Sequence, residues 1–148
     1  MAETVVLNKL LHVREREKIA AQKVYQQSID FFEAIGTQLY ELLKKKEAAE
    51  ASYEASLSDM TTLEKLREQV RYIEELNHHI VRLQEEVNQA RNNMESKQEQ
   101  LTNAHIEMKK FEKLIETREK NEIEIQQRKE KASMDELSIY QFLNHKNR

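Results

Sequence analysis

The sequence predicts an all-α fold, namely a long antiparallel two-helix coiled-coil hairpin. The 148 residues are dominated by helix formers and include one Gly and no Pro. Strands joined by tight turns need far more of both residues. Two long stretches also repeat apolar residues at alternating spacings of three and four. That repeat draws a narrow apolar seam along a helix, which a second helix must cover.

The first seam predicts a long helix over residues 7–56, preceded by a flexible N-terminus at residues 1–6. Gly36 lies inside this helix and has two interpretations. It is either a tolerated helix glycine, costing about 1 kcal/mol relative to Ala, or a bend or a close approach of a partner. Ten of the fourteen seam positions are apolar: Leu7, Leu11, Arg14, Lys18, Ala21, Tyr25, Ser28, Phe32, Ile35, Leu39, Leu42, Lys46, Ala49 and Tyr53.

A connecting turn is predicted at residues 57–61, inside the chain's one internal cluster of cap and turn residues. Thr61 and Glu64 have the spacing of a capping box, in which the two side chains satisfy backbone N–H groups at a helix start. Because the connection is short, the helices on either side are expected to lie antiparallel.

The second seam predicts a helix over residues 62–131, followed by a C-terminal tail at 132–148. Near the start of this helix the apolar spacing loses one residue between Val70 and Ile73, which predicts a local sideways shift of the seam. Only one of its thirteen regular positions is polar: Ile73, Leu76, Ile80, Leu83, Val87, Ala90, Met94, Lys97, Leu101, Ala104, Met108, Phe111 and Ile115.

Folding the helices back on each other pairs residues 7–56 with about 62–112. The charged stretch 117–131 then overhangs as a solvated helix or as a part that a partner orders. Apolar and aromatic side chains gather near the hairpin end on both helices. They indicate a docking surface or a local irregularity of the supercoil.

Catalytic, metal and phosphate-binding patterns are missing from the sequence. There is no Cys, the five His residues do not share one helix face, and one Gly cannot form a phosphate-cradling loop. The 24 basic and 27 acidic side chains are intermixed, which opposes nucleic-acid or anionic-membrane binding. No apolar run approaches the ~18 residues of a membrane span. We therefore expect no enzyme activity, cofactor or metal, no nucleic-acid partner and no direct membrane insertion.

Four blocks of sequence resemble the FliJ family of flagellar type III export proteins, particularly its form in Bacillus-like bacteria. They read NKLLHVREREK, YQQSIDFFE, MKKFEKLIETREK and MDELSIYQFL. The likeness runs almost end to end. The N-terminal segment through Val6 and the connecting turn carry no family feature.

The resemblance implies a non-enzymatic stalk in bacterial flagellum biogenesis, and hence in motility. Such a stalk is cytoplasmic and peripheral at the cytoplasmic face of the cell membrane, at the flagellar base. Its implied partners are the hexameric export ATPase, the cytoplasmic domain and linker of the export gate protein, and export chaperones. On its own it is expected to be a monomer.

The resemblance also implies two partner-binding surfaces. At the hairpin end, facing the gate, these are Gln38, Leu42, Tyr72, Leu76, His79 and Leu83. At the open end, facing the ATPase, these are Leu7, Leu11, Arg14, Lys18, Phe111 and Arg118. The chain departs from the family at Lys45 and Ala49, where the gate patch is expected to carry aromatic residues.

The alternative function is a coiled-coil dimerisation scaffold, in which the seams pair between chains rather than within one chain. A single chain in solution indicates the hairpin, whereas a dimer indicates the scaffold.

Overall fold

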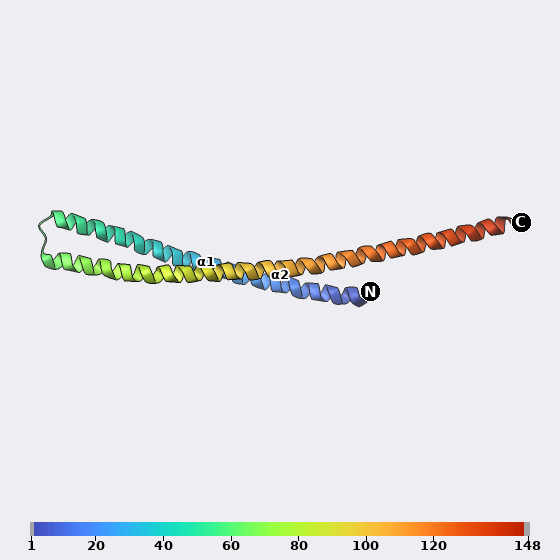
Figure 1. The fold of residues 1–148 in the computed structure, drawn as a ribbon, viewed down its shortest axis with the longest axis horizontal. Helices are drawn as coiled ribbons and strands as arrows, with labels where there is room; N and C mark the ends of the chain where they lie inside the picture. The colour runs from blue at the N-terminus through green and yellow to red at the C-terminus, as the bar shows by residue number, and fades with distance from the viewer. Residues whose placement is uncertain (1, 147–148) are drawn as a thin grey trace. The chain divides into compact units, whose positions relative to one another are not determined.

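The computed structural model describes residues 2–146, which form two α-helices and no strand (Figure 1). Helix α1 spans Ala2–Ser58 and helix α2 spans Leu63–Lys146. The two helices pack against each other in antiparallel directions. The predicted class, an all-α coiled-coil hairpin, is confirmed.

Both helices extend further than the sequence pattern indicated. Residues 2–6, predicted to be flexible, belong to α1, and residues 132–146, predicted to be a tail, continue α2. No Gly or Pro interrupts either segment, so nothing in their composition ends a helix there. Met1 and residues 147–148 of the two predicted segments lie outside the described residues.

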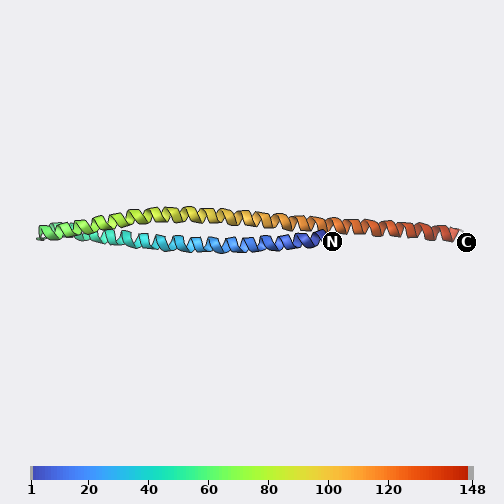
Figure 2. The ribbon, with the colours of Figure 1, turned by 90° about the horizontal axis from the view of Figure 1, so that it is seen from below.

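The chain divides into two packed units. One is Ile19–Asn103, which includes the turn, and the other combines residues up to Lys18 with those from Ala104 onward. In the first unit, the second part of α1 and the first part of α2 lie side by side (Figures 1 and 2).

All seam positions predicted within residues 19–103 are buried or half-buried, on both helices. The most deeply buried apolar side chains are those of Ile35, Leu76, Ile80 and Ala90, with 4–7% exposure. Burying a large apolar side chain of this kind contributes about 1.5–3 kcal/mol. The core of this unit is therefore one thin line of side chains between two helices.

Near the turn the seam differs from the predicted one. Gln69 occupies the interface, while Val70 and Leu63 are 37% and 65% exposed. With Gln69 between Leu66 and Ile73, the three–four spacing continues without a dropped residue. The predicted sideways shift is therefore wrong: a regular supercoil is kept here, and the more apolar neighbour is turned outward.

The interfacial Gln69 is only partly satisfied. Its Nε2 donates to the Ser56 Oγ across the hairpin at 3.1 Å, but its Oε1 is buried without a hydrogen-bond partner among the described residues. A buried polar atom left unpaired costs about 1–3 kcal/mol.

Gln69→Leu is expected to raise the free energy of unfolding by about 1 kcal/mol, because it removes that unpaired oxygen and adds apolar area to the seam. Urea unfolding followed by circular dichroism measures the change. The neighbouring exposed Glu68→Leu is the control, expected to stay within about 0.5 kcal/mol of the parent. A clear loss of stability in Gln69→Leu would show that its hydrogen bond to Ser56 outweighs the unpaired oxygen.

The cap of α2 lies one residue later than predicted. The Thr62 Oγ1 accepts the Lys65 backbone N–H at 3.3 Å, and the Leu66 N–H reaches the Thr62 carbonyl at 3.2 Å. Since the third helical position is Lys65 rather than Glu64, the reciprocal bond of a capping box is not formed.

Gly36 is half-buried in α1, and a Cβ built on it meets nothing within 4 Å. Its dihedral angle φ is not positive. The position therefore shows neither a left-handed conformation nor a close approach within the chain, in agreement with a tolerated helix glycine.

Gly36→Ala is accordingly expected to stabilise the protein by about 1 kcal/mol through helix propensity. Thermal or urea unfolding measures this gain. A destabilised variant would mean that a neighbouring group needs the space that the glycine leaves.

In the second unit, the first turns of α1 pack on α2 through the predicted open-end seam. The Arg14 guanidinium lies over the Phe111 ring, 5.5 Å from its centroid, and Arg118 forms an ion pair with Glu3. Met108 and Ile115 are its buried apolar residues, each 7% exposed.

Beyond Arg118 every described residue of α2, from 119 to 146, is exposed. The paired part of α2 therefore extends to Arg118, a few residues beyond the predicted limit near 112. The reason lies at the turn, where Ser56 pairs with Gln69 and not with a residue nearer 62.

Candidate partner-binding surfaces

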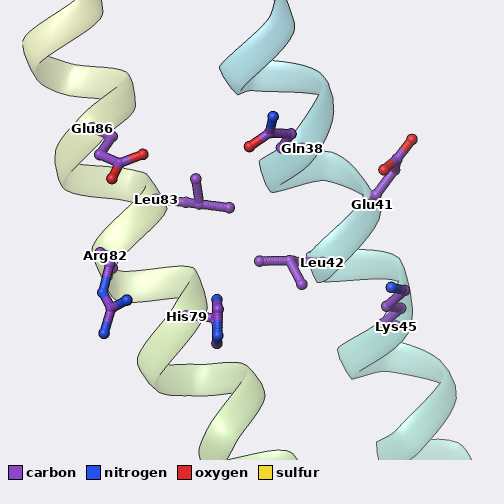
Figure 3. A pocket seen from close by; sticks show the side chains of 8 residues that line it. All are labelled: Gln38, Glu41, Leu42, Lys45, His79, Arg82, Leu83 and Glu86. Carbon is purple, nitrogen blue, oxygen red and sulfur yellow. The ribbon is translucent and has the colours of Figure 1, made fainter.

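A groove of about 380 Å³ lies between the helices in the unit formed by Ile19–Asn103 (Figure 3). Its floor is apolar, because Leu42 of α1 and Leu83 of α2 point toward each other across it. Both leucines are half-buried. The groove is lined by Gln38, Glu41, Leu42, Lys45, His79, Arg82, Leu83 and Glu86.

The charged rims of this groove are separated by sign. Glu41 and Glu86 lie toward one end with Gln38, while Lys45 and Arg82 lie toward the other end with His79 (Figure 3). Glu41 and Lys45 are four residues apart on one helix, and so are Arg82 and Glu86. Even so, no ion pair of these four is found among residues 2–146. The four charges are therefore available to a partner.

The structure brings together four of the six residues predicted at the hairpin end: Gln38, Leu42, His79 and Leu83. Tyr72 is 48% exposed but does not line this groove. Leu76 is 6% exposed, because it packs between the helices, and so it offers almost no surface to a partner.

Sequence reasoning missed the charged groove residues Glu41, Arg82 and Glu86. A signal was present, since each helix places an acidic and a basic residue next to, or three residues from, its groove leucine. Such spacing puts them on the same helix face as the leucine or next to it.

A second hollow, of about 350 Å³, lies near the turn. Val70 and Leu63, which the seam turns outward, form part of its apolar wall, and Arg67 and Arg71 stand at its rim. It is lined by Tyr53, Leu63, Leu66, Arg67, Val70, Arg71 and Glu74. None of these residues was predicted to contact a partner.

The six residues predicted at the open end are all half-buried: Leu7, Leu11, Arg14, Lys18, Phe111 and Arg118. Arg14 stacks on Phe111, and Arg118 pairs with Glu3 beside a hollow of about 360 Å³ that Val6 and Leu7 also line. These side chains therefore hold α1 on α2, and their free surface is limited.

The large free surface of this unit is the part of α2 beyond Arg118. It carries eight exposed large apolar side chains, each 52–69% exposed: Ile123, Ile125, Met134, Leu137, Ile139, Tyr140, Phe142 and Leu143. Several of them belong to the segment that was predicted to be a tail.

Within residues 2–146, no three His, Asp or Glu side chains are grouped so as to hold a metal ion. Neither described helix contains a stretch apolar enough to cross a membrane.

Comparison with known proteins settles the family. The family model described as flagellar FliJ protein matches residues 4–147. The chain belongs to the FliJ family. It is similar to the flagellar FliJ protein of Bacillus subtilis (strain 168), with 36% identity over 143 residues, covering 97% of each chain. No solved structure matches the chain significantly.

Membership in the FliJ family makes this chain a component of flagellar protein export, as its resemblance to Bacillus-like members implied.

Proposed function

We propose that this FliJ-family chain is a non-enzymatic stalk that couples the hexameric export ATPase to the export gate. It escorts export chaperones and works at the cytoplasmic face of the cell membrane. The observation that carries the proposal is the free end of α2, residues 119–146, which has no partner helix within the described chain and exposes eight large apolar side chains.

A helix of this kind calls for a partner. Contiguous exposed apolar side chains mark interaction sites, and a mean helix segment gains most of its stability from packing rather than from propensity. The charged stretch 117–131 and the apolar residues from Met134 to Leu143 together offer a long surface for the central channel of a ring.

The mixed charges of this end suit a ring partner. One stalk cannot make six identical interfaces with a six-fold ring, so its contacts must be interchangeable and individually weak. Lys and Glu alternate closely between Thr117 and Lys131, and exposed ion pairs of this type contribute only about 0–1 kcal/mol each. Such contacts can be exchanged as the ring turns over.

The groove between Leu42 and Leu83 supports the gate as the second partner. It contains four of the residues that the family resemblance assigns to the gate patch, together with four charges that make no ion pair within residues 2–146. Lys45 stands in this groove where the family pattern has an aromatic residue, so in this chain a cation takes part in the contact.

ATP hydrolysis by the purified export ATPase, measured with and without this chain, tests the stalk proposal. We expect the chain to bind the ring and to raise its hydrolysis rate, with no hydrolysis by the chain alone. A ring that neither binds the chain nor changes its rate would contradict the proposal.

Light scattering separates the stalk from the alternative, a coiled-coil dimerisation scaffold. The hairpin predicts the mass of one chain, because α1 and α2 cover each other's seams within a single molecule. A stable dimer at micromolar concentration would favour the scaffold.

A further inference from the structure

A second hollow continues the gate groove along the hairpin. It has a volume of about 380 Å³ and shares Glu86 with the groove between Leu42 and Leu83. Both hollows belong to the unit formed by Ile19–Asn103. The second hollow is lined by Phe31, Ile35, Glu86, Gln89, Ala90 and Asn93.

The two hollows lie on the same side of the hairpin. On α1, Phe31, Gln38 and Lys45 are spaced by seven residues, and on α2 the same spacing joins His79, Glu86 and Asn93. In a coiled coil a seven-residue repeat keeps side chains on one face. The hollows are therefore two parts of one continuous groove.

Phe31 makes the second hollow an apolar subsite. Its ring is 57% exposed, an unusual state for a phenylalanine that touches an interhelical groove. The floor beside it is formed by Ile35 and by Ala90, whose small side chain is 4% exposed. A large residue at position 90 would fill this space, whereas alanine leaves it open next to an aromatic wall.

The charges give the combined groove a direction. Lys45, Arg82 and His79 stand at one end. The Phe31 end has the amides of Gln89 and Asn93 and no cation in its lining. The nearby Arg91 guanidinium is directed over the Phe32 ring, 5.8 Å from its centroid.

We propose that one segment of the gate linker occupies both hollows, with two large apolar side chains and a carboxylate. One apolar side chain sits on Leu42 and Leu83 and the other on Phe31, about 16 Å away along α1 at 1.5 Å per residue. The carboxylate faces Lys45 and Arg82. This inference rests on the proposed contact with the gate, and adds Phe31 and Arg82 to it.

The test is binding of the full-length chain to the purified cytoplasmic region of the gate protein, linker included, measured by calorimetry. Phe31→Ala is expected to weaken binding about tenfold or more, since a central aromatic anchor in an interface usually contributes at least that much. Phe31→Leu should restore part of the loss. Arg82→Glu should also weaken binding, and raising the salt concentration should narrow its difference from the parent.

Tyr40→Ala is the matched control. Tyr40 is an aromatic residue of α1 with 58% exposure, close to that of Phe31, and it lines neither hollow. It should bind like the parent. Circular dichroism is expected to show equal helicity and thermal unfolding for the parent and both alanine variants, because neither side chain is buried.

The outcomes separate the two proposals. If the parent binds and Phe31→Ala binds equally well, the second subsite is wrong and the gate contact stands. If Phe31→Ala and Tyr40→Ala lose affinity equally, the subsite is likewise wrong, because the loss is not specific to the groove. If the parent does not bind the gate region at all, the proposed function fails and this inference fails with it.

Discussion

Ile80→Ala is expected to lower the free energy of unfolding by about 2–4 kcal/mol, the usual range for truncating a buried isoleucine. Ile80 is 5% exposed, within a core that is one side chain wide. No second layer of residues can close over the cavity, so the loss should lie toward the upper part of that range. Urea unfolding followed by circular dichroism at 222 nm, a wavelength diagnostic of helix on the order of which any spectropolarimeter reads, measures it.

Val81→Ala is the matched control for this prediction. Val81 is the next residue of α2 and is 64% exposed. Its truncation should change the free energy of unfolding by less than about 0.5 kcal/mol. Equal effects of the two substitutions would contradict the placement of the seam and, with it, the hairpin.

Replacing Ile139, Phe142 and Leu143 together with glutamine is expected to weaken binding to the export ATPase about tenfold or more, as the loss of a cluster of apolar anchors usually does. The three side chains are 52–66% exposed and belong to the unpaired end of α2. Glutamine favours helix about as well as leucine does, so the helix itself should persist. Binding and hydrolysis rate, measured with the purified ring, test the prediction.

The control for the triple variant replaces three exposed apolar residues of α1, Val13, Ile19 and Val24, with glutamine. Both variants should unfold at the same urea concentration as the parent. If the α1 variant loses ATPase binding and the α2 variant retains it, the ring contacts α1 rather than the free end of α2.

The sequence pattern predicted the paired faces of the hairpin well, because their physics is local. Each seam position is buried or half-buried, including the polar ones: Arg14 is accommodated over the Phe111 ring, and Ser28 donates its hydroxyl to the Tyr25 carbonyl at 2.6 Å. Periodicity identifies such positions whatever their polarity.

The pattern failed where two helices, rather than one, decide the outcome. Val70 is the more apolar choice for the interface, yet Gln69 occupies it, because the regular spacing and the partner Ser56 determine the face of α2 near the turn. The pairing of α1 with α2 up to Arg118 follows from the same local geometry. No count of apolar residues contains that information.

The candidate groove was predicted only in part for a similar reason. Gln38, Leu42, His79 and Leu83 came from resemblance to a family, and the structure places them together. Leu76, drawn from the same resemblance, is buried against α1. Glu86 and Phe31 meet in one hollow only after the helices are aligned, since they are 55 positions apart in the chain.

Ser28 and Lys97 are the polar members of two otherwise apolar stretches of the seam. Continuing the register of Ser56 with Gln69, and of Leu42 with Leu83, sets these two side chains level with each other. A slide of one helix along the other by one heptad would bring Lys97 level with Ile35 or Ala21, and an ammonium group against an apolar neighbour is unfavourable. Lengthwise creep is thereby opposed at its first step, so a pull or twist applied to one helix is passed on to the other instead of being lost as slippage.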